Sequence, residues 1–278
     1  MSMETMRRSG SSKLTLVLIV MFAACFLQAQ TPVDKSWSSL MSGATDKSAA
    51  KREKAIHALG LIPGDPKAQE MAETALSDEN FEVRSAGAEA LGQMGAKGSI
   101  PKLVAAISDK DVTVVLAATN ALSALGDDRA YDVYYAMLVG ERKSGESLVE
   151  SQMKMMKDPK ALAGMGIEAG LGFIPFAGAG YQVFKMARKD DSSPVRAAAA
   201  QKLVRDPDPK SGEALAKVVS DKKWVVRASV ADAIAKREDP ALLPAVISAL
   251  DDENDNVKYN AAAAVIRLSK IQPAKRAE

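Results

Sequence analysis

A motif that recurs at one fixed interval along the chain is the feature that most limits the folds open to it. An aspartate opens each copy, and a valine–arginine pair and a run of small residues follow at fixed distances. Such self-similarity at a short period is typical of a protein built from stacked copies of one unit. The five clearest copies begin at Asp78, Asp109, Asp190, Asp221 and Asp252, and a weaker sixth copy, one residue out of register, begins at Asp46.

Each unit is predicted to contain two helices. The aspartate is expected to start the first helix, because its side chain accepts hydrogen bonds from first-turn amides. Apolar residues such as Val83, Ala90 and Leu91 follow at helical spacing. Prolines suited to a first helical turn mark the second helix in the segments 99–108 and 239–250. Because one helix pair cannot bury its apolar stripe alone, three or more pairs must stack.

The pattern D-x-x-x-x-V-R-x-x-A-x-x-A-L-G resembles the HEAT-like repeats first named for phycobilisome lyases, and it extends over roughly residues 46–270. The resemblance implies an all-α, HEAT-like alpha-alpha superhelix, a solenoid, here with an inserted apolar helical hairpin. Such repeats mostly provide scaffolds and binding surfaces, so the resemblance says more about fold than about function. It further implies that aspartates and arginines pair between neighbouring units, which would link Asp78, Asp190 and Asp221 with Arg84, Arg196 and Arg227.

The period is interrupted once, between Asp109 and Asp190. This interval is longer than two repeat periods, and what remains after the first unit fits a degenerate repeat plus one more helix. The run 169–184 within it carries no charge and is rich in glycine. We interpret it as part of a close-packed helical hairpin, whose glycines let the backbones touch. The alternative is an exposed tip that contacts a partner or a membrane through Phe173, Ile174, Phe176 and Tyr181.

Two other interpretations of this glycine-rich stretch are disfavoured. A dinucleotide-binding loop needs a preceding strand and a different glycine spacing. A membrane-spanning helix needs about 20 apolar residues, whereas this run is shorter and is broken by Pro175.

Residues 1–29 are predicted to be a signal peptide. Three basic residues precede the uncharged segment 14–27, and small residues follow it, which is the layout of a secretory signal. An uncleaved anchor is the alternative. Cys25, the only cysteine, ends a segment that resembles a lipoprotein signal and would then be lipidated, whereas ordinary cleavage near Ala29 would remove it. We therefore expect an exported protein, periplasmic or extracellular, anchored to a membrane if Cys25 is retained.

Charge and composition argue against several classes of function. The chain has 37 basic and 35 acidic side chains, of which three and one lie in residues 1–29, so the remainder is neutral and unsuited to nucleic acid. Deoxyhypusine hydroxylases resemble this architecture and bind iron through paired His–Glu motifs, but the only histidine, His57, is not followed by glutamate. The carboxylates at 126–128, 206–209 and 251–255 are assigned to helix capping. We predict no catalytic, cofactor-binding or metal-binding residues.

These observations divide the chain and suggest its role. The predicted parts are a signal peptide (1–29), an N-terminal cap segment (30–45), N-terminal repeats (46–139), a degenerate repeat with the glycine-rich hairpin (140–189), and C-terminal repeats with a cap (190–278). The last unit has only its first helix. We predict a non-catalytic scaffold or protein-binding module of the bacterial cell envelope, with a protein partner. Two alternatives stay open: an accessory or lyase-like subunit of an enzyme system, and a membrane-associated lipoprotein.

Overall fold

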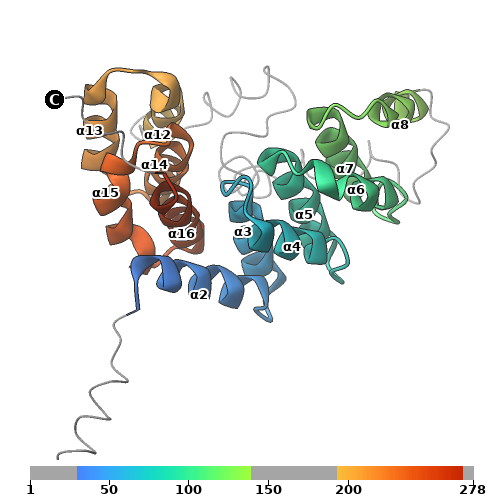
Figure 1. Ribbon diagram of the computed structural model, residues 1–278, viewed down its shortest axis with the longest axis horizontal. Coiled ribbons are helices and arrows are strands. Elements are labelled where there is room, and N and C mark those ends of the chain that lie inside the picture. The colour runs from blue at the N-terminus through green and yellow to red at the C-terminus, as the bar shows by residue number, and fades with distance from the viewer. Residues whose placement is uncertain (1–29, 139–192, 272–278) are drawn as a thin grey trace, which may run out of the picture. The chain divides into compact units, whose positions relative to one another are not determined.

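The computed structural model describes residues 30–138 and 193–271. Every regular element in these two ranges is helical, which confirms the predicted all-α solenoid (Figure 1). Within the same ranges, no helix is long and apolar enough to cross a membrane. The predicted signal peptide and the predicted hairpin insertion lie outside the described residues.

The repeated motif forms the first helix of each pair, but its aspartate does not cap that helix. The carboxylate of Asp78 accepts a hydrogen bond of 2.9 Å from the backbone N–H of Asn80, and Asn80 is the N-cap, accepting from Glu82 N at 2.8 Å. The expected start was therefore wrong by two residues, because the aspartate forms a local turn ahead of the cap. The first helices are α3 (Ala49–Leu59), α5 (Phe81–Met94), α7 (Val112–Ala124), α12 (Ser193–Lys202), α14 (Trp224–Arg237) and α16 (Asp255–Ser269).

The second helices are shorter, and Pro101 lies in the first turn of α6 (Ile100–Ala106), as predicted. In the segment 239–250, Pro240 instead begins a 3-10 turn that precedes the α-helix. Pro66 and Pro209 begin two further second helices in the same way as Pro101. Carboxylates cap them where the sequence suggested: Asp208 accepts from Lys210 N at 2.9 Å. The second helices that follow a first helix in the chain are α4 (Pro66–Ala75), α6 (Ile100–Ala106), α8 (Arg129–Leu138), α13 (Pro209–Val218) and α15 (Leu243–Ile247), with short 3-10 turns at Lys97–Ser99, Leu203–Arg205, Pro240–Leu242 and Ser248–Asp251.

Small side chains let the first helices approach each other closely. Alanines form much of the buried core, together with leucine, isoleucine and valine. At Gly92 of α5 the approach is too close for any side chain, since a Cβ there would lie 2.9 Å from the Cα of Ala121 on α7. The low aromatic content of the chain thus suits a core in which backbones nearly touch.

The helix pairs stack in an order that differs from their order in the chain. In the C-terminal array (193–271), α12 contacts α14 and α14 contacts α16. Helix α16 then contacts α3, the first repeat helix of the N-terminal array (30–138), in which α3 contacts α5 and α5 contacts α7. Figure 1 shows α16 on the side of α3 that faces away from α5. The last repeat of the chain therefore adjoins the first.

Helix α2 (Pro32–Ala44) supplies the second helix that the last repeat lacks. It packs against α16 and against α3, as α4 packs against both α3 and α5 (Figure 1). Leu40 of α2 is fully buried, and a Cβ added to Gly43 would lie 2.6 Å from the ring of Tyr259 on α16. We call the α16–α2 pair the split unit, because its helices come from opposite ends of the described chain.

Candidate functional site: an ionic ladder and a polar row

Arginine–aspartate pairs join neighbouring first helices and form what we call the ionic ladder. The Nε and Nη2 atoms of Arg84 each donate a hydrogen bond of 2.8 Å to the carboxylate of Asp109, while Nη1 donates to the backbone oxygen of Asp78 at 2.9 Å. This confirms the pairing between units that the repeat resemblance implied, apart from Asp190, which lies outside the described residues. The other rungs are Arg52–Asp78, Arg196–Asp221 and Arg227–Asp252.

The charges of the ladder neutralise each other, and except for the half-exposed Arg196 they are largely buried. The side chain of Arg84 is 6% exposed and that of Asp109 is 14% exposed. Burial alone would raise the pKa of Asp109, but hydrogen bonds from the Arg84 guanidinium and from the Asp111 amide outweigh it and lower that pKa. The hydrogen bond to Asp109 in turn raises the pKa of Arg84. Both groups stay charged at neutral pH and serve to hold adjacent units in register.

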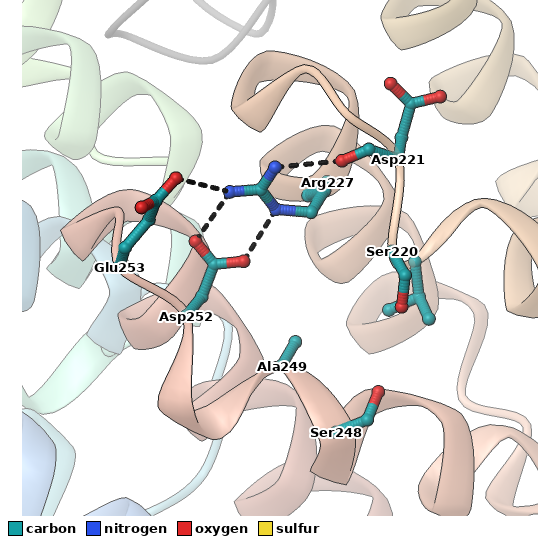
Figure 2. A pocket seen from close by; sticks show the side chains of 8 residues that line it. Ser220, Asp221, Arg227, Ser248, Ala249, Asp252 and Glu253 are labelled. Atoms are coloured by element: carbon teal, nitrogen blue, oxygen red, sulfur yellow. Dashed lines mark hydrogen bonds and ion pairs between the residues drawn. The ribbon is translucent and has the colours of Figure 1, made fainter.

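A shallow cavity of about 390 Å³ opens beside the Arg227 rung, between two inter-helix turns (Figure 2). The guanidinium that faces it is already occupied. Its Nε and Nη2 donate to the carboxylate of Asp252 at 2.6 and 2.8 Å, and its Nη1 donates to the backbone oxygen of Asp221 at 2.8 Å. Glu253 lies 3.9 Å from Nη2 on the open side. The cavity therefore adds acidic character to the surface without offering a free cation for an anionic ligand.

A second series of side chains follows the stack at one helix position, eleven residues after the repeated aspartate. We call this series the polar row. Five of its six positions are polar, and the exception is Ala263 in the split unit, which is fully buried. In stacking order, from α12 to α7, the row consists of Gln201, Asp232, Ala263, His57, Glu89 and Asn120.

Members of the polar row interact with each other and with their surroundings. The amide of Gln201 donates to Asp232 at 2.8 Å, and the Lys236 ammonium lies 2.9 Å from the other carboxylate oxygen of Asp232. At the far end, the hydroxyl of Tyr134 on α8 donates to Asn120 at 2.6 Å. These bonds fix the orientation of the side chains, and the row presents polar groups on both sides of the buried Ala263.

His57 and Glu89 form the titratable centre of this row. Their Nε2 and Oε2 atoms lie 4.0 Å apart, and their side chains are 32% and 27% exposed. Burial raises the pKa of Glu89 to about 7. Burial also lowers the pKa of His57, although the charge of Asp232 across Ala263 opposes that shift. In the described ranges no group of three or more His, Cys, Asp or Glu residues is placed to hold a metal ion.

One further surface escaped the sequence analysis. On α8, Tyr131, Tyr135 and Leu138 are 65%, 64% and 85% exposed and recur at helical spacing on one face. The spacing of these residues was the signal that could have found them.

The residues singled out from the sequence have different outcomes. His57, the only histidine, is half-buried within the polar row. Trp224 is partly buried against the core, and Lys67 lies 4.5 Å from the ring centre of Trp37. The proposed contact residues Phe173, Ile174, Phe176 and Tyr181, and the proposed lipidation site Cys25, lie outside the described residues and stay predictions.

Stacked helix pairs, joined by a repeated ionic rung and presenting equivalent side chains on one face, define an α-solenoid repeat protein. The family model for HEAT repeats matches residues 37–123, 71–144 and 182–266, so this chain belongs to the HEAT repeat family. A search of curated proteins found no match.

Solved structures with similar folds include two natural proteins. Human deoxyhypusine hydroxylase in complex with glycerol is 19% identical, with a TM-score of 0.29, and the alignment covers 86% of this chain and 85% of that one. The complex of CpcE and CpcF of phycocyanin lyase from Nostoc sp. is 19% identical, with a TM-score of 0.33 and coverage of 86% and 94%. At TM-scores this low, the assignment rests on the family match and on the helix pairs themselves.

Proposed function

We propose that this chain is a non-catalytic scaffold that binds a protein partner along the polar row. The observation that carries the proposal is the repetition of a polar side chain at one position in five first helices, beside a ladder whose charges are used internally. Stacked helices lie roughly 8–10 Å apart, so the row offers hydrogen-bonding groups at regular steps. Extended surfaces of this kind are how solenoid proteins engage elongated partners.

The chemistry of the row favours a polypeptide over other ligands. Amide, carboxylate and imidazole groups alternate along it, and such groups match the donors and acceptors of a peptide backbone and polar side chains. The carboxylates of Asp232 and Glu89 would suit a partner segment that carries basic residues, especially above the pKa of Glu89. The described residues offer no site built for catalysis beyond the His57–Glu89 pair, which lacks a third group to orient it.

Affinity capture with row variants tests this proposal. The chain from residue 30 onward, immobilised and exposed to an envelope extract, is expected to retain a specific protein. The double variant Asp232→Ala/Glu89→Ala should retain much less of it, whereas Glu70→Ala, which removes an exposed carboxylate on α4, should retain as much as the wild type. Equal retention by all three chains would contradict binding along the row. Recovery of an enzyme as the partner would favour the accessory-subunit alternative.

We further propose that the protein acts in the cell envelope after export. The layout of residues 1–29 supports this, since a basic segment, an apolar core and small residues follow in order. Fractionation of cells that produce the wild type or the Cys25→Ser variant distinguishes a protein released by cleavage from one anchored to a membrane through Cys25. A soluble periplasmic protein in both cases supports cleavage near Ala29, and loss of membrane attachment only in the variant supports lipidation. Retention of both chains in the cytoplasm would overturn export.

A further inference from the structure

The contact between α16 of the split unit and α3 lacks an ionic rung. The other neighbouring first helices of the described stack are each joined by one. At the arginine position of α16 stands Lys258, whose ammonium lies 3.2 Å from Asp255 on the same helix. Asp46, which occupies the aspartate position before α3, accepts instead from Ser48 N at 2.8 Å and lies 3.6 Å from Lys51. Contact between α16 and α3 therefore forms without the bidentate pair found between α5 and α7.

Polar contacts also join the split unit to its neighbours, and some of them are exposed. Lys35 of α2 lies 2.5 Å from Asp251, but these side chains are 41% and 78% exposed, and exposed ion pairs contribute little to stability. Lys270 pairs with Asp65, and Arg267 Nη1 donates to the backbone oxygen of Leu61 at 3.1 Å. Closure depends mainly on the packing of α2 into the groove between α16 and α3.

The chain connection makes this closure comparable to binding between separate molecules. Elsewhere a short turn links the two helices of a pair, but α2 and α16 are held together only through the rest of the chain, including the whole segment 139–192. The surface of α16 that receives α2 and α3 is the same in every copy, so the α2–α3 pair of a second copy can compete for it when the protein is concentrated.

We propose that the split unit is an exchangeable seam, at which a second copy of this chain can supply α2 and complete the C-terminal array in trans. Each copy then contributes its N-terminal array to the C-terminal array of the other. The product is a reciprocal dimer that keeps the contacts of α16 with α2 and α3. The seam is the part of the described stack suited to exchange, because its two helices are not connected by a turn.

Two full-length variants with complementary defects test the proposal. Gly43→Val places a side chain where even a Cβ would meet Tyr259 at 2.6 Å and Ala55 at 2.8 Å, so it should open the seam from the α2 side. Tyr259→Ala weakens the seam from the α16 side by leaving a cavity. Mixed at high concentration, the two chains are expected to form a dimer that contains one copy of each. One seam of this dimer then joins an unaltered α2 to an unaltered α16. The other seam joins the valine introduced by Gly43→Val to the cavity left by Tyr259→Ala. Native mass spectrometry with differently tagged chains identifies the dimer.

Three controls keep the result interpretable. Each variant alone should remain without a dimer, and Gly98→Ala, at a position where the nearest atom is 3.5 Å away, should behave as the wild type. The chain carrying both Gly43→Val and Tyr259→Ala should close on itself again. Circular dichroism checks that each variant keeps its helices. Failure of the helical variants to form the mixed dimer, or equal dimer formation by each variant alone, would overturn the exchangeable seam.

Discussion

Arg84 and Asp109 are joined by two hydrogen bonds of 2.8 Å across the contact between α5 and α7, with side chains only 6% and 14% exposed. Two parallel bonds fix both the distance and the rotation of one unit relative to the next. The guanidinium also binds the turn ahead of its own helix, through the backbone oxygens of Asp78 and Glu79. One side chain thus orders a helix start and a unit boundary together.

Removing this arginine should therefore cost much stability. Arg84→Met leaves the Asp109 carboxylate buried without its partner, and breaking a buried pair in this way costs about 3–5 kcal/mol. Urea unfolding at pH 7 measures the change. Arg129→Met is the matched control, since Arg129 pairs with Asp127 at the surface with 53% of its side chain exposed, and its loss should cost less than about 1 kcal/mol. Similar losses for both variants would show that the ladder contributes no more than an ordinary surface pair.

Acid should unfold the protein through the ladder. Burial opposes ionisation of the ladder aspartates, but hydrogen bonds from backbone amides and arginines outweigh it and lower the pKa values of Asp78, Asp109, Asp221 and Asp252. A depressed folded-state pKa stabilises the fold above the usual carboxyl pKa, and that stabilisation is lost as pH falls from there through the folded-state value. The ladder itself should contribute no change in the urea midpoint between pH 7 and 5, and it should make the midpoint fall steeply below pH 4. Midpoints unchanged down to pH 3 would contradict this mechanism.

Glu89 should have the opposite pH dependence. Burial raises its pKa from 4.5 to about 7, so its charged form is disfavoured in the folded state. Its cost to stability appears as pH rises above 4.5 and is complete above 7. Glu89→Gln should therefore stabilise the protein by about 1–3 kcal/mol at pH 8, with the lower end favoured by partial exposure, and change little at pH 4. Denaturant titrations at both pH values decide this, and equal effects at both would show that the charge of Glu89 is not the cause.

Gly92 should not tolerate even one methyl group. A Cβ there would meet the Cα of Ala121 at 2.9 Å and its Cβ at 3.0 Å, so α5 and α7 would have to move apart. Overpacking of this kind costs about 1–3 kcal/mol, which exceeds the roughly 1 kcal/mol that alanine gains over glycine within a helix. Thermal unfolding of Gly92→Ala compared with Gly98→Ala measures the effect. A stabilised Gly92→Ala chain would mean that the helices can separate freely.

The sequence predicted the repeated elements well, because the period itself encodes them. The helix pairs, the prolines of the second helices and the capping role of Asp208 follow from local rules, and the structure has them. The rungs were expected from a family resemblance, because spacing alone does not say which aspartate an arginine reaches. The exact helix start was missed, since an aspartate two residues before the cap has nearly the same local signature as the cap itself.

The features that depend on which helices meet in space were not predictable. Nothing in the stretch 32–44 shows that it completes a repeat at the opposite end of the chain, because α2 lacks the motif and its partner is chosen by packing. The polar row could have been found by comparing one column of the repeats, but its continuity across the two arrays required the contact between α16 and α3. The perturbed pKa of Glu89 likewise depends on burial that the sequence does not contain.

The split unit also sets an order of events during synthesis. Among the described helices α2 is made first and α16 last, so α2 can pair with α3 at once, whereas its contact with α16 must wait. Until the last described repeat is made, the part of α2 that meets α16, including Gly43 against Tyr259, stays uncovered. A surface near the beginning of the described chain thus stays open for as long as the intervening repeats take to be made.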